Sequence, residues 1–385
     1  MIHSATSGSR IVVAMSGGVD SSTTAALLKE GGHEVIGLTM QLYDHGDTNA
    51  QQSGTCCSLD DVHDARRVAN ALGIPHYVVN LQDAFRKLVV DNLVNEYKEG
   101  RTPNPCVRCN EFMKFRLLLD RALALGADYL ATGHYAKIVR NPATDLLELR
   151  RATDSLKDQS YFLYCVDQQQ LSHLLFPLGS MTKSEVRTHA QRFHLPTATK
   201  SESQDVCFIA GESYRQFMER NDGTGLPGIG EIVSLEGTTL GRHQGHHRYT
   251  IGQRKGLGVA HNEPLYVVGI DAANNRVTVG GQNDLVANGL KAKKLQWISG
   301  ASPPPDQLLH IKIRYRTPAS PGYLTEQSGR LGTFRFIEPV RAVTPGQTVV
   351  VYDGDTVLGG GLIDGAMEQG QNWNVSEHHR EGAAA

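Results

Sequence analysis

The chain has 385 residues and a formal net charge of −2, with 38 lysines and arginines against 40 aspartates and glutamates. This length allows two or three domains, and the near-neutral charge excludes a broadly basic nucleic-acid-binding surface, so any RNA footprint must be local. No apolar run approaches the roughly 20 residues that cross a bilayer, and the N-terminus lacks an apolar signal core, which predicts a cytoplasmic protein. In a reducing compartment, the six cysteines are expected to be catalytic, metal-binding or buried.

Residues 1–9 are expected to be disordered, and the first predicted element lies within Arg10 to Ser22, which reads R-I-V-V-A-M-S-G-G-V-D-S-S. The β-branched run 11–13 predicts a strand buried on both faces. Gly17 and Gly18 end it, and a helix is expected over 23–29. A strand, a glycine turn and a helix N-terminus together favour an anion site, because free N–H groups and the helix dipole attract negative charge.

This loop differs from the common phosphate loop, which needs the pattern G-x-x-x-x-G-K-[ST] and a lysine that reaches the terminal phosphates. The string S-G-G-x-D-S instead resembles the pyrophosphate loop of the ATP pyrophosphatases. Those enzymes activate a carbonyl oxygen as its adenylate and release pyrophosphate. A nucleotide site is therefore predicted here rather than an ordinary glycine turn.

Strands and helices alternate as far as residue 132. Strands are predicted over 34–43, 76–81 and 128–132, and helices from Ser58, over 82–99 and over 112–125, with a turn-rich loop over 100–110. This alternation predicts an α/β fold with a doubly wound parallel sheet. Ligands of such sheets bind beyond the carboxyl ends of the strands, where the first loop, Met40 and Gly133-His134 fall.

The pattern changes after Ala136. A hairpin is expected within 138–149, and helices over 157–164 and 184–193. From Gly223 the chain is glycine-rich and β-like, with a linker or turn over 280–289 and short strands over 291–363, which is typical of small barrels. The predicted division is a catalytic domain over 1–210, a central β-rich domain over 211–282, a C-terminal β-barrel-like domain over 288–366 and a disordered tail over 367–385.

The cysteines support three interpretations. Cys106 and Cys109 lie in T-P-N-P-C-V-R-C-N, where a helix is expected to begin at Asn110, so the dipole would favour a thiolate. Cys109 and the distant Cys207 could be a catalytic pair that passes sulfur and closes a transient disulfide. The C-x-x-C could be half of a zinc site, or Cys106, Cys109 and Cys207 could hold an iron–sulfur cluster. A buried, inert thiol is expected for Cys165.

Taken together, the motifs resemble those of the tRNA-uridine 2-sulfurtransferases, the bacterial tRNA-specific 2-thiouridylases. They occur in the family's order: A-M-S-G-G-V-D-S-S, G-L-T-M, G-R-T-P-N-P-x-x-x-C-N, A-T-G-H-Y, K-D-Q-S-Y-F-L, S-x-S-Q-D-V-C-F-I, H-R-Y-T-I-G-Q-R-K-G-L-G and V-T-P-G-Q. The resemblance implies ATP-dependent 2-thiolation of the wobble uridine of tRNA, position 34. An adenylated uridine and a cysteine persulfide would be intermediates, and AMP and pyrophosphate would be released.

The resemblance also assigns residues. The ATP contacts it implies are Ala14, Met15, Ser16, Gly17, Gly18, Val19, Asp20, Ser21, Met40 and Gly133. Cys207 would carry the persulfide, and Cys109 would be the partner nucleophile that forms a disulfide with it. The target base would meet Asn104, Pro105 and Cys106. The tRNA contacts it implies are His134, Lys157, Asp158, Gln159, Arg314, Tyr315 and Gln347.

One position departs from the family. Many members have aspartate, a candidate general base, where this chain has Cys106. A thiol has a higher ordinary pKa than a carboxylate and is a softer ligand, so that role does not carry over. Mg²⁺ is expected with ATP, an iron–sulfur cluster remains an alternative, and no other metal is expected. The expected partners are tRNA and a sulfur donor protein such as a cysteine desulfurase, with no membrane, and the protein is expected to be a monomer.

Two further alternatives stay open at this point. Another pyrophosphate-loop ligase, such as an amide or guanidino synthetase, would share the loop but need no cysteine. A non-catalytic RNA-binding protein that senses redox state or metal would bind tRNA without turning over ATP.

Overall fold

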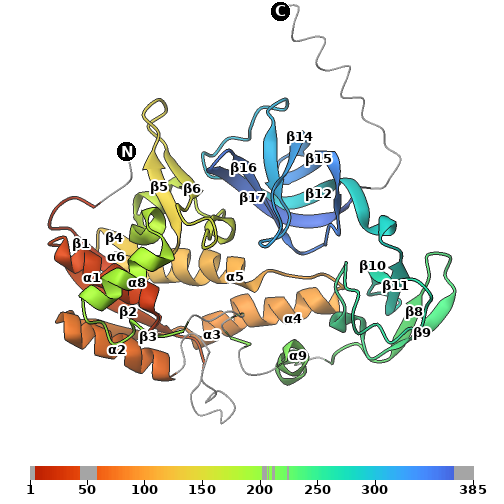
Figure 1. Ribbon diagram of the computed structural model, residues 1–385, viewed down its shortest axis with the longest axis horizontal. Coiled ribbons are helices and arrows are strands. Elements are labelled where there is room, and N and C mark those ends of the chain that lie inside the picture. Colours follow the sequence, from red (N-terminus) through yellow and green to blue (C-terminus); the bar gives the residue numbers. More distant parts are fainter. Residues whose placement is uncertain are drawn as a thin grey trace, which may run out of the picture.

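The computed structural model describes residues 5–43, 59–201, 206, 208–209, 213–222 and 225–367. Figure 1 shows an N-terminal α/β region, a small middle sheet and a C-terminal barrel, with two long helical segments running between the first region and the middle sheet. No helix within the described ranges is long and apolar enough to span a membrane.

The two predicted disordered ends are described only in part. The expected disorder is wrong for residues 5–9, because Thr6 and Ser9 form a hydrogen-bonded turn and Ser9 is buried. At the other end, Met367 is buried and its N–H donates to the Gly289 carbonyl at 3.0 Å. Residues 1–4 and 368–385 lie outside the described residues.

The parallel sheet has the strand order β3-β2-β1-β4-β7, and each neighbouring pair is parallel. Its strands are β1 (Arg10–Ala14), β2 (Glu34–Gln41), β3 (His76–Asn80), β4 (Tyr129–Ala131) and β7 (Leu174–Leu175). On β1, Ile11 and Val13 pack into one apolar cluster and Val12 packs into another. Successive side chains of a strand point to opposite faces, so the unbroken apolar run confirms a strand buried on both sides.

Helices cover both faces of this sheet, which confirms the predicted doubly wound fold (Figure 1). One face is covered by α1 (Val19–Glu30), α2 (Leu59–Leu72) and α8 (Lys183–Arg192). The other face is covered by α3 (Gln82–Phe85), η2 (Arg86–Val90), α4 (Asp91–Lys98), α5 (Pro105–Arg108), η3 (Cys109–Leu118) and α6 (Leu119–Ala124). The short elements α7 (Gln168–Ser172) and η5 (Pro177–Ser180) flank β7.

The helix that carries the C-x-x-C begins earlier than the sequence predicts. Asn104 is the N-cap, its side-chain oxygen accepts a hydrogen bond from the Val107 N–H at 3.3 Å, and Pro105 occupies the first turn. Proline suits that position because its fixed φ is helical and it has no N–H to satisfy. The expected start at Asn110 is therefore wrong, and Cys106 lies in the first turn of the helix.

The predicted hairpin is present as β5 (Ala136–Arg140) and β6 (Leu147–Arg151). It joins the C-terminal sheet through the pairing of β6 with β17, and it thereby ties the first region to the barrel. The helix expected over 157–164 is wrong: only η4 (Ser160–Phe162) is helical. The Asp158 carboxylate accepts the N–H groups of Ala152 and Ser160, and these bonds hold the preceding residues in a loop.

The middle region contains a four-stranded sheet of order β10-β11-β8-β9. Its elements are β8 (Gly230–Val233), β9 (Thr239–His243), η6 (His246–Arg248), β10 (Tyr266–Asp271) and β11 (Arg276–Gly280). The preceding helix α9 (Tyr214–Asn221) packs Phe217 into the same apolar cluster as the α3–α6 segment.

The C-terminal strands follow the order β12-β15-β14-β13-β16-β17, and an added β12–β17 pairing closes them into a barrel. They are β12 (Val286–Trp297), β13 (Leu309–Lys312), β14 (Ser320–Ser328), β15 (Leu331–Arg341), β16 (Thr348–Asp353) and β17 (Thr356–Ala366). The linker expected over 280–289 is partly wrong, because η7 (Asn283–Leu285) leads straight into β12. Figure 1 shows the barrel beside the β5–β6 hairpin.

Candidate active site

A cavity of about 990 Å³ lies where the carboxyl ends of the parallel strands, the start of α5, the loop after β6 and the barrel meet. Most of the residues predicted for the site line it: Ala14, Met15, Ser16, Gly18, Val19, Asp20, Ser21, Met40, Asn104, Pro105, Cys106, Gly133, His134, Lys157, Asp158, Gln159, Tyr315 and Gln347. Gly17, Cys109 and Arg314 lie outside the lining, and Cys207 lies outside the described residues.

The glycine turn after β1 requires a residue without a side chain. Gly17 has φ +70°, and a Cβ placed on it would lie 2.2 Å from the carbonyl oxygen of Asp61. The Ser21 hydroxyl accepts the Ser16 N–H at 3.1 Å, and no described side chain caps the first turn of α1 at Gly18. The first residues of this helix line the cavity, and the N–H groups of a helix's first turn are donors suited to an anion.

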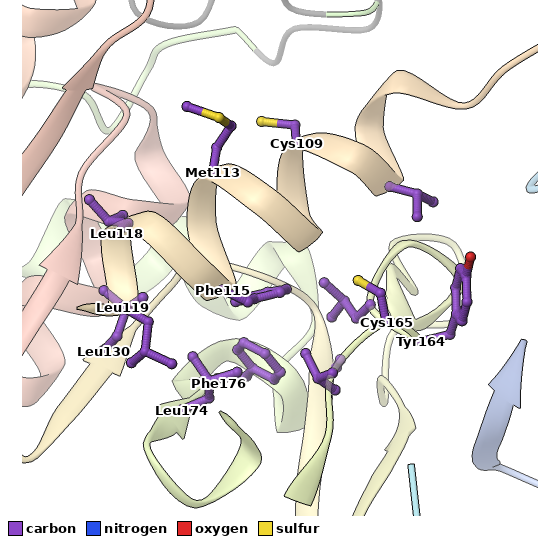
Figure 2. Packing of buried hydrophobic residues seen from close by; sticks show 14 of the residues in the cluster. Cys109, Met113, Phe115, Leu118, Leu119, Leu130, Tyr164, Cys165, Leu174 and Phe176 are labelled. Atoms are coloured by element: carbon purple, nitrogen blue, oxygen red, sulfur yellow. The ribbon is translucent and has the colours of Figure 1, made fainter. Parts of the chain in front are cut away.

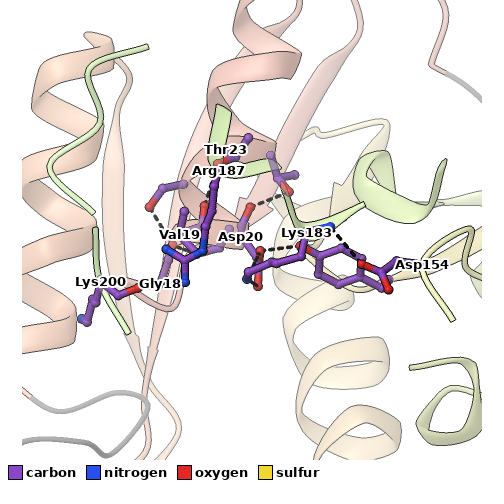
Figure 3. A network of polar contacts seen from close by, with 12 residues as sticks. Gly18, Val19, Asp20, Thr23, Asp154, Lys183, Arg187 and Lys200 are labelled. Carbon is purple, nitrogen blue, oxygen red and sulfur yellow. Dashed lines mark hydrogen bonds and ion pairs between the residues drawn. The ribbon is translucent and has the colours of Figure 1, made fainter. Parts of the chain in front are cut away.

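Lys183, which the sequence prediction missed, supplies a cation beside this loop. Its ammonium group lies 2.8 and 2.9 Å from the two carboxylate oxygens of Asp20 (Figure 3). The Tyr135 hydroxyl donates to the same carboxylate at 2.8 Å. Lys183 begins α8, far from the glycine turn in sequence. The loop motif contains no lysine, and Lys183 of α8 instead places an ammonium group beside the loop.

Lys200 is a second cation that sequence reasoning missed. Its ammonium donates to the Gly17 carbonyl at 3.1 Å and to Asp61 and Asp64 at 2.7 Å each. Burial alone lowers the pKa of Lys200, but the bonds to the two carboxylates outweigh it and raise the pKa above its ordinary value. Lys200 is therefore charged, and it fixes the glycine turn against α2.

His134 is buried and neutral. Burial, together with the nearby Lys114 ammonium, holds the pKa of His134 well below its ordinary value. Lys114 lies 3.2 Å from Nε2 and can only donate, so Nε2 is the acceptor and the Nδ1 proton points to the Thr132 hydroxyl at 2.7 Å. His134 therefore orients Lys114 toward the cavity rather than supplying a charge of its own.

The two cysteines of the C-x-x-C have different environments. Cys106 is half-buried and lines the cavity, whereas Cys109 is 8% exposed and belongs to the main apolar cluster. Figure 2 shows Cys109 and Met113 on the same side of the helix, with Cys165 packed near its other side. Cys165 is buried, and burial raises its pKa well above the ordinary value, so it fits the inert thiol predicted for it.

Several of the residues predicted to contact tRNA use their side chains in hydrogen bonds within the protein. Asp158 is buried and accepts backbone N–H groups, and Gln159 accepts the Tyr135 N–H at 2.9 Å. Arg314 donates to the carbonyl oxygens of Ile251 and Ala342 at 3.0 Å, so it joins the barrel to the middle region. These three side chains therefore hold the structure, although Asp158 and Gln159, like Lys157, also line the cavity.

An aromatic pair forms part of the cavity wall. The rings of Phe162 and Tyr315 lie 4.5 Å apart between centroids, and both residues line the cavity. The Lys312 ammonium lies 5.6 Å from the Tyr315 ring centroid, and burial and the nearby Arg151 lower the pKa of Lys312. Flat apolar faces beside cations are suited to nucleobases and phosphates.

Charge is concentrated around the cavity although the whole chain is nearly neutral. The lining includes the cations Lys114, Arg151, Lys157, Lys183, Lys200, Lys312 and Arg316, and the carboxylates Asp20, Asp61 and Asp158. Because the whole chain is nearly neutral, a surface that binds RNA must be a local concentration of positive charge. The excess of cations in this lining is such a concentration. Within the described ranges, no three His, Cys, Asp or Glu side chains form a group that could hold a metal ion.

Family models match three successive parts of the chain. They are a tRNA methyl transferase HUP domain over residues 9–211, a tRNA methyl transferase PRC-barrel domain over 223–281 and an aminomethyltransferase beta-barrel domain over 287–363. A solved 4-thiouridine synthetase–RNA complex with bound ATP is 17% identical, with a TM-score of 0.35 over 55% of this chain and 49% of that one. That likeness is too low to bear on function.

Curated relatives match almost end to end. The tRNA-specific 2-thiouridylase MnmA of Geobacter metallireducens is 54% identical over 364 residues, which cover 94% of this chain and 98% of the relative. The tRNA-specific 2-thiouridylase MnmA of Geotalea uraniireducens is 52% identical over 363 residues, covering 93% and 96%. The chain therefore belongs to the tRNA-specific 2-thiouridylases, the tRNA-uridine 2-sulfurtransferases, as the resemblance of its motifs implied.

Proposed function

We propose that this enzyme uses ATP to place sulfur on C2 of the wobble uridine, position 34 of tRNA. The observation that supports this most directly is that one cavity joins the glycine turn to the Asn104–Cys106 segment and to Lys157 and Tyr315. A nucleotide at one end and a base at the other would bring a phosphate and a carbonyl oxygen together. A cytoplasmic monomer is part of the same proposal.

At the ATP end, the amide groups of residues 18–21 and the Lys183 ammonium would hold the phosphates. The C2 oxygen of the uracil attacks the α-phosphate, the bond to pyrophosphate breaks, and an adenylated uridine forms. Donors aimed at the departing pyrophosphate stabilise its developing charge. Mg²⁺ would enter with ATP as part of the substrate and bridge its phosphates.

At the base end, Asn104, Pro105 and Cys106 line the cavity near His134, and the Phe162–Tyr315 pair offers a face for stacking. Because His134 is neutral, it would carry no charge toward the activated base, and its neighbour Lys114, 3.2 Å from its Nε2, would contribute the stabilising interaction there. We propose no general-base role for His134, since its Nε2 lone pair already faces the Lys114 ammonium.

Sulfur would arrive as a persulfide on Cys207, delivered by a donor such as a cysteine desulfurase or a relay protein. Its terminal sulfur attacks C2, and the carbon–oxygen bond to AMP breaks. The Cys109 thiolate attacks Cys207 Sγ as the sulfur–sulfur bond breaks, leaving 2-thiouridine and a Cys109–Cys207 disulfide. A dithiol reductant then returns both thiols by exchange. Because Cys109 is buried, this step requires local movement of the helix start.

The iron–sulfur alternative would use Cys106, Cys109 and Cys207 as ligands. Of these, the structure describes Cys106 on the cavity wall and Cys109 in the apolar cluster, which is an unequal pair. Cys207 lies outside the described residues, and no step above depends on a cluster.

The test is an anaerobic assay with tRNA, ATP–Mg²⁺, a cysteine desulfurase with L-cysteine as the persulfide donor, and a dithiol reductant, read by mass spectrometry for 2-thiouridine. Wild type is compared with Cys109→Ser, Cys207→Ser and Cys106→Ser, and Cys165→Ser serves as the buried-thiol control. We expect product from wild type and the control, and none from Cys109→Ser or Cys207→Ser. Full formation of 2-thiouridine by Cys207→Ser would contradict the thiol chemistry, whereas brown, iron-containing active protein would favour the cluster.

A further inference from the structure

Leu156 is the most exposed of the large apolar side chains in the described ranges, with 89% of its surface accessible, and it lines the cavity. Single exposed leucines are ordinary on protein surfaces, so exposure alone carries no meaning. Ile229 at 64% and Leu235 at 55% are also exposed, but they belong to the middle region and do not line the cavity. The place of Leu156, at the rim of the site, distinguishes it.

The turn that carries Leu156 is held on both sides by hydrogen bonds. The Asp154 carboxylate accepts the Leu156 N–H at 3.1 Å and the Lys183 N–H at 2.9 Å. The Asp154 carbonyl accepts the Lys157 N–H at 3.1 Å, which closes the turn. One residue further, Asp158 accepts two more backbone N–H groups. A turn fixed in this way presents the leucine side chain with little further loss of entropy when a ligand arrives.

The surroundings of Leu156 suit single-stranded RNA. Lys157 follows it directly, and Lys312 lines the same cavity as a second cation for phosphates. The Phe162–Tyr315 rings belong to that lining too, and they could stack a base that has left the RNA. The apolar side chain thus shares one cavity with both the cations and the aromatic wall.

A base that is stacked in an anticodon loop must leave the stack to reach such a cavity, and unstacking it costs free energy. Proteins that unstack bases insert apolar side chains, leucine among them, into the gap. We infer that Leu156 inserts beside the wobble uridine and fills the space that the extruded base vacates. This inference rests on the proposed function, because it requires that uridine to be the target.

The test uses an anticodon stem-loop with 2-aminopurine at the nucleotide 3′ of the wobble uridine, whose fluorescence rises when it loses its stacking partner. Wild type, Leu156→Ala, the conservative Leu156→Met and the control Leu235→Ala are compared. We expect the rise with all but Leu156→Ala. In thiolation, Leu156→Ala should lose about 10-fold in kcat with little change in KM, because unstacking is the step affected.

A second substrate separates insertion from a structural role. An abasic nucleotide at the same 3′ position removes the stack, so it should restore kcat of Leu156→Ala toward that of wild type. Unchanged fluorescence and kcat in Leu156→Ala, or a defect that the abasic substrate does not restore, would overturn the inference. A fluorescence rise with wild type but no 2-thiouridine would instead refute the proposed reaction and leave the insertion standing.

Discussion

The side-chain amide of Gln347 in the barrel donates a hydrogen bond to the main-chain carbonyl of Thr102 at 2.9 Å, across 245 residues of sequence. The same amide reaches the Pro103 carbonyl at 3.2 Å, and the Thr102 N–H donates to the Pro345 carbonyl at 2.9 Å. The barrel loop thus holds the stretch of chain that leads into Asn104 and the cysteine-bearing helix. A C-terminal residue thereby positions the segment proposed to meet the target base.

Gln347→Ala should lower kcat/KM for thiolation about 30-fold, because two hydrogen bonds of about 1 kcal/mol each are lost. Hydrogen exchange over residues 101–106 should rise in the same variant. Gln307→Ala, which removes an exposed bond to Asp353 in the barrel, is the matched control and should change neither quantity. A higher KM for tRNA with unaltered exchange would mean that Gln347 acts only by touching RNA.

Gly17→Ala should abolish ATP binding and lower the melting temperature, because the added Cβ would overlap the Asp61 carbonyl oxygen. Gly32→Ala is the control: Gly32 has a similar φ of +80° but nothing within 4 Å of its Cβ position. The control should cost about 1 kcal/mol from backbone strain alone and keep ATP binding. Isothermal titration with ATP and thermal melting would measure both, and equal losses in the two variants would contradict the overlap.

Lys183→Met should weaken ATP binding about 10-fold or more, because it removes a cation and leaves the Asp20 carboxylate facing the phosphates. Arg192→Met on the same helix removes an exposed ion pair to Glu30, which lies on α1 as Asp20 does, so it should stay near wild type. Binding of ATP is measured directly by titration. Equal affinities of the two variants would show that Lys183 serves only to hold Asp20.

Acid should destabilise the protein through His247. Burial, then the nearby Arg248 and His246, lower the pKa of His247 from 6.5 to about 4, and neither ring nitrogen has a hydrogen-bond partner among the described residues. The unfolded chain therefore binds a proton more readily, so this contribution to stability is complete above pH 6.5 and is lost as the pH falls toward 4.

Between pH 7 and pH 5 the loss should amount to at most about 2 kcal/mol of unfolding free energy. In His247→Phe that part of the pH dependence should disappear, whereas in His63→Gln, on the exposed face of α2, it should remain. Urea unfolding at the two pH values measures it. Parallel pH profiles of wild type and His247→Phe would contradict the assignment to this histidine.

Local patterns in the sequence were sufficient to predict the doubly wound sheet, the glycine turn and the clustering of site residues at strand ends. An unbroken apolar, β-branched run such as 11–13 is stable only in a strand buried on both faces. Gly17 adopts a positive φ, which glycine tolerates because it has no side chain. The helix start was misplaced at Asn110 because asparagine and proline, as at 104–105, are equally typical of turns and of helix starts.

The tertiary structure alone decided which distant residues complete the site. Lys183 and Lys200 reach the glycine turn, Gln347 reaches Thr102, and the β5–β6 hairpin joins the barrel, each through contacts between segments far apart in the chain. The separation of two residues along the chain does not predict such contacts, because the contacts depend on how the packed layers bring side chains together. Burial likewise distinguishes the two cysteines of the C-x-x-C, because Cys106 lines the cavity whereas Cys109 packs into the apolar cluster.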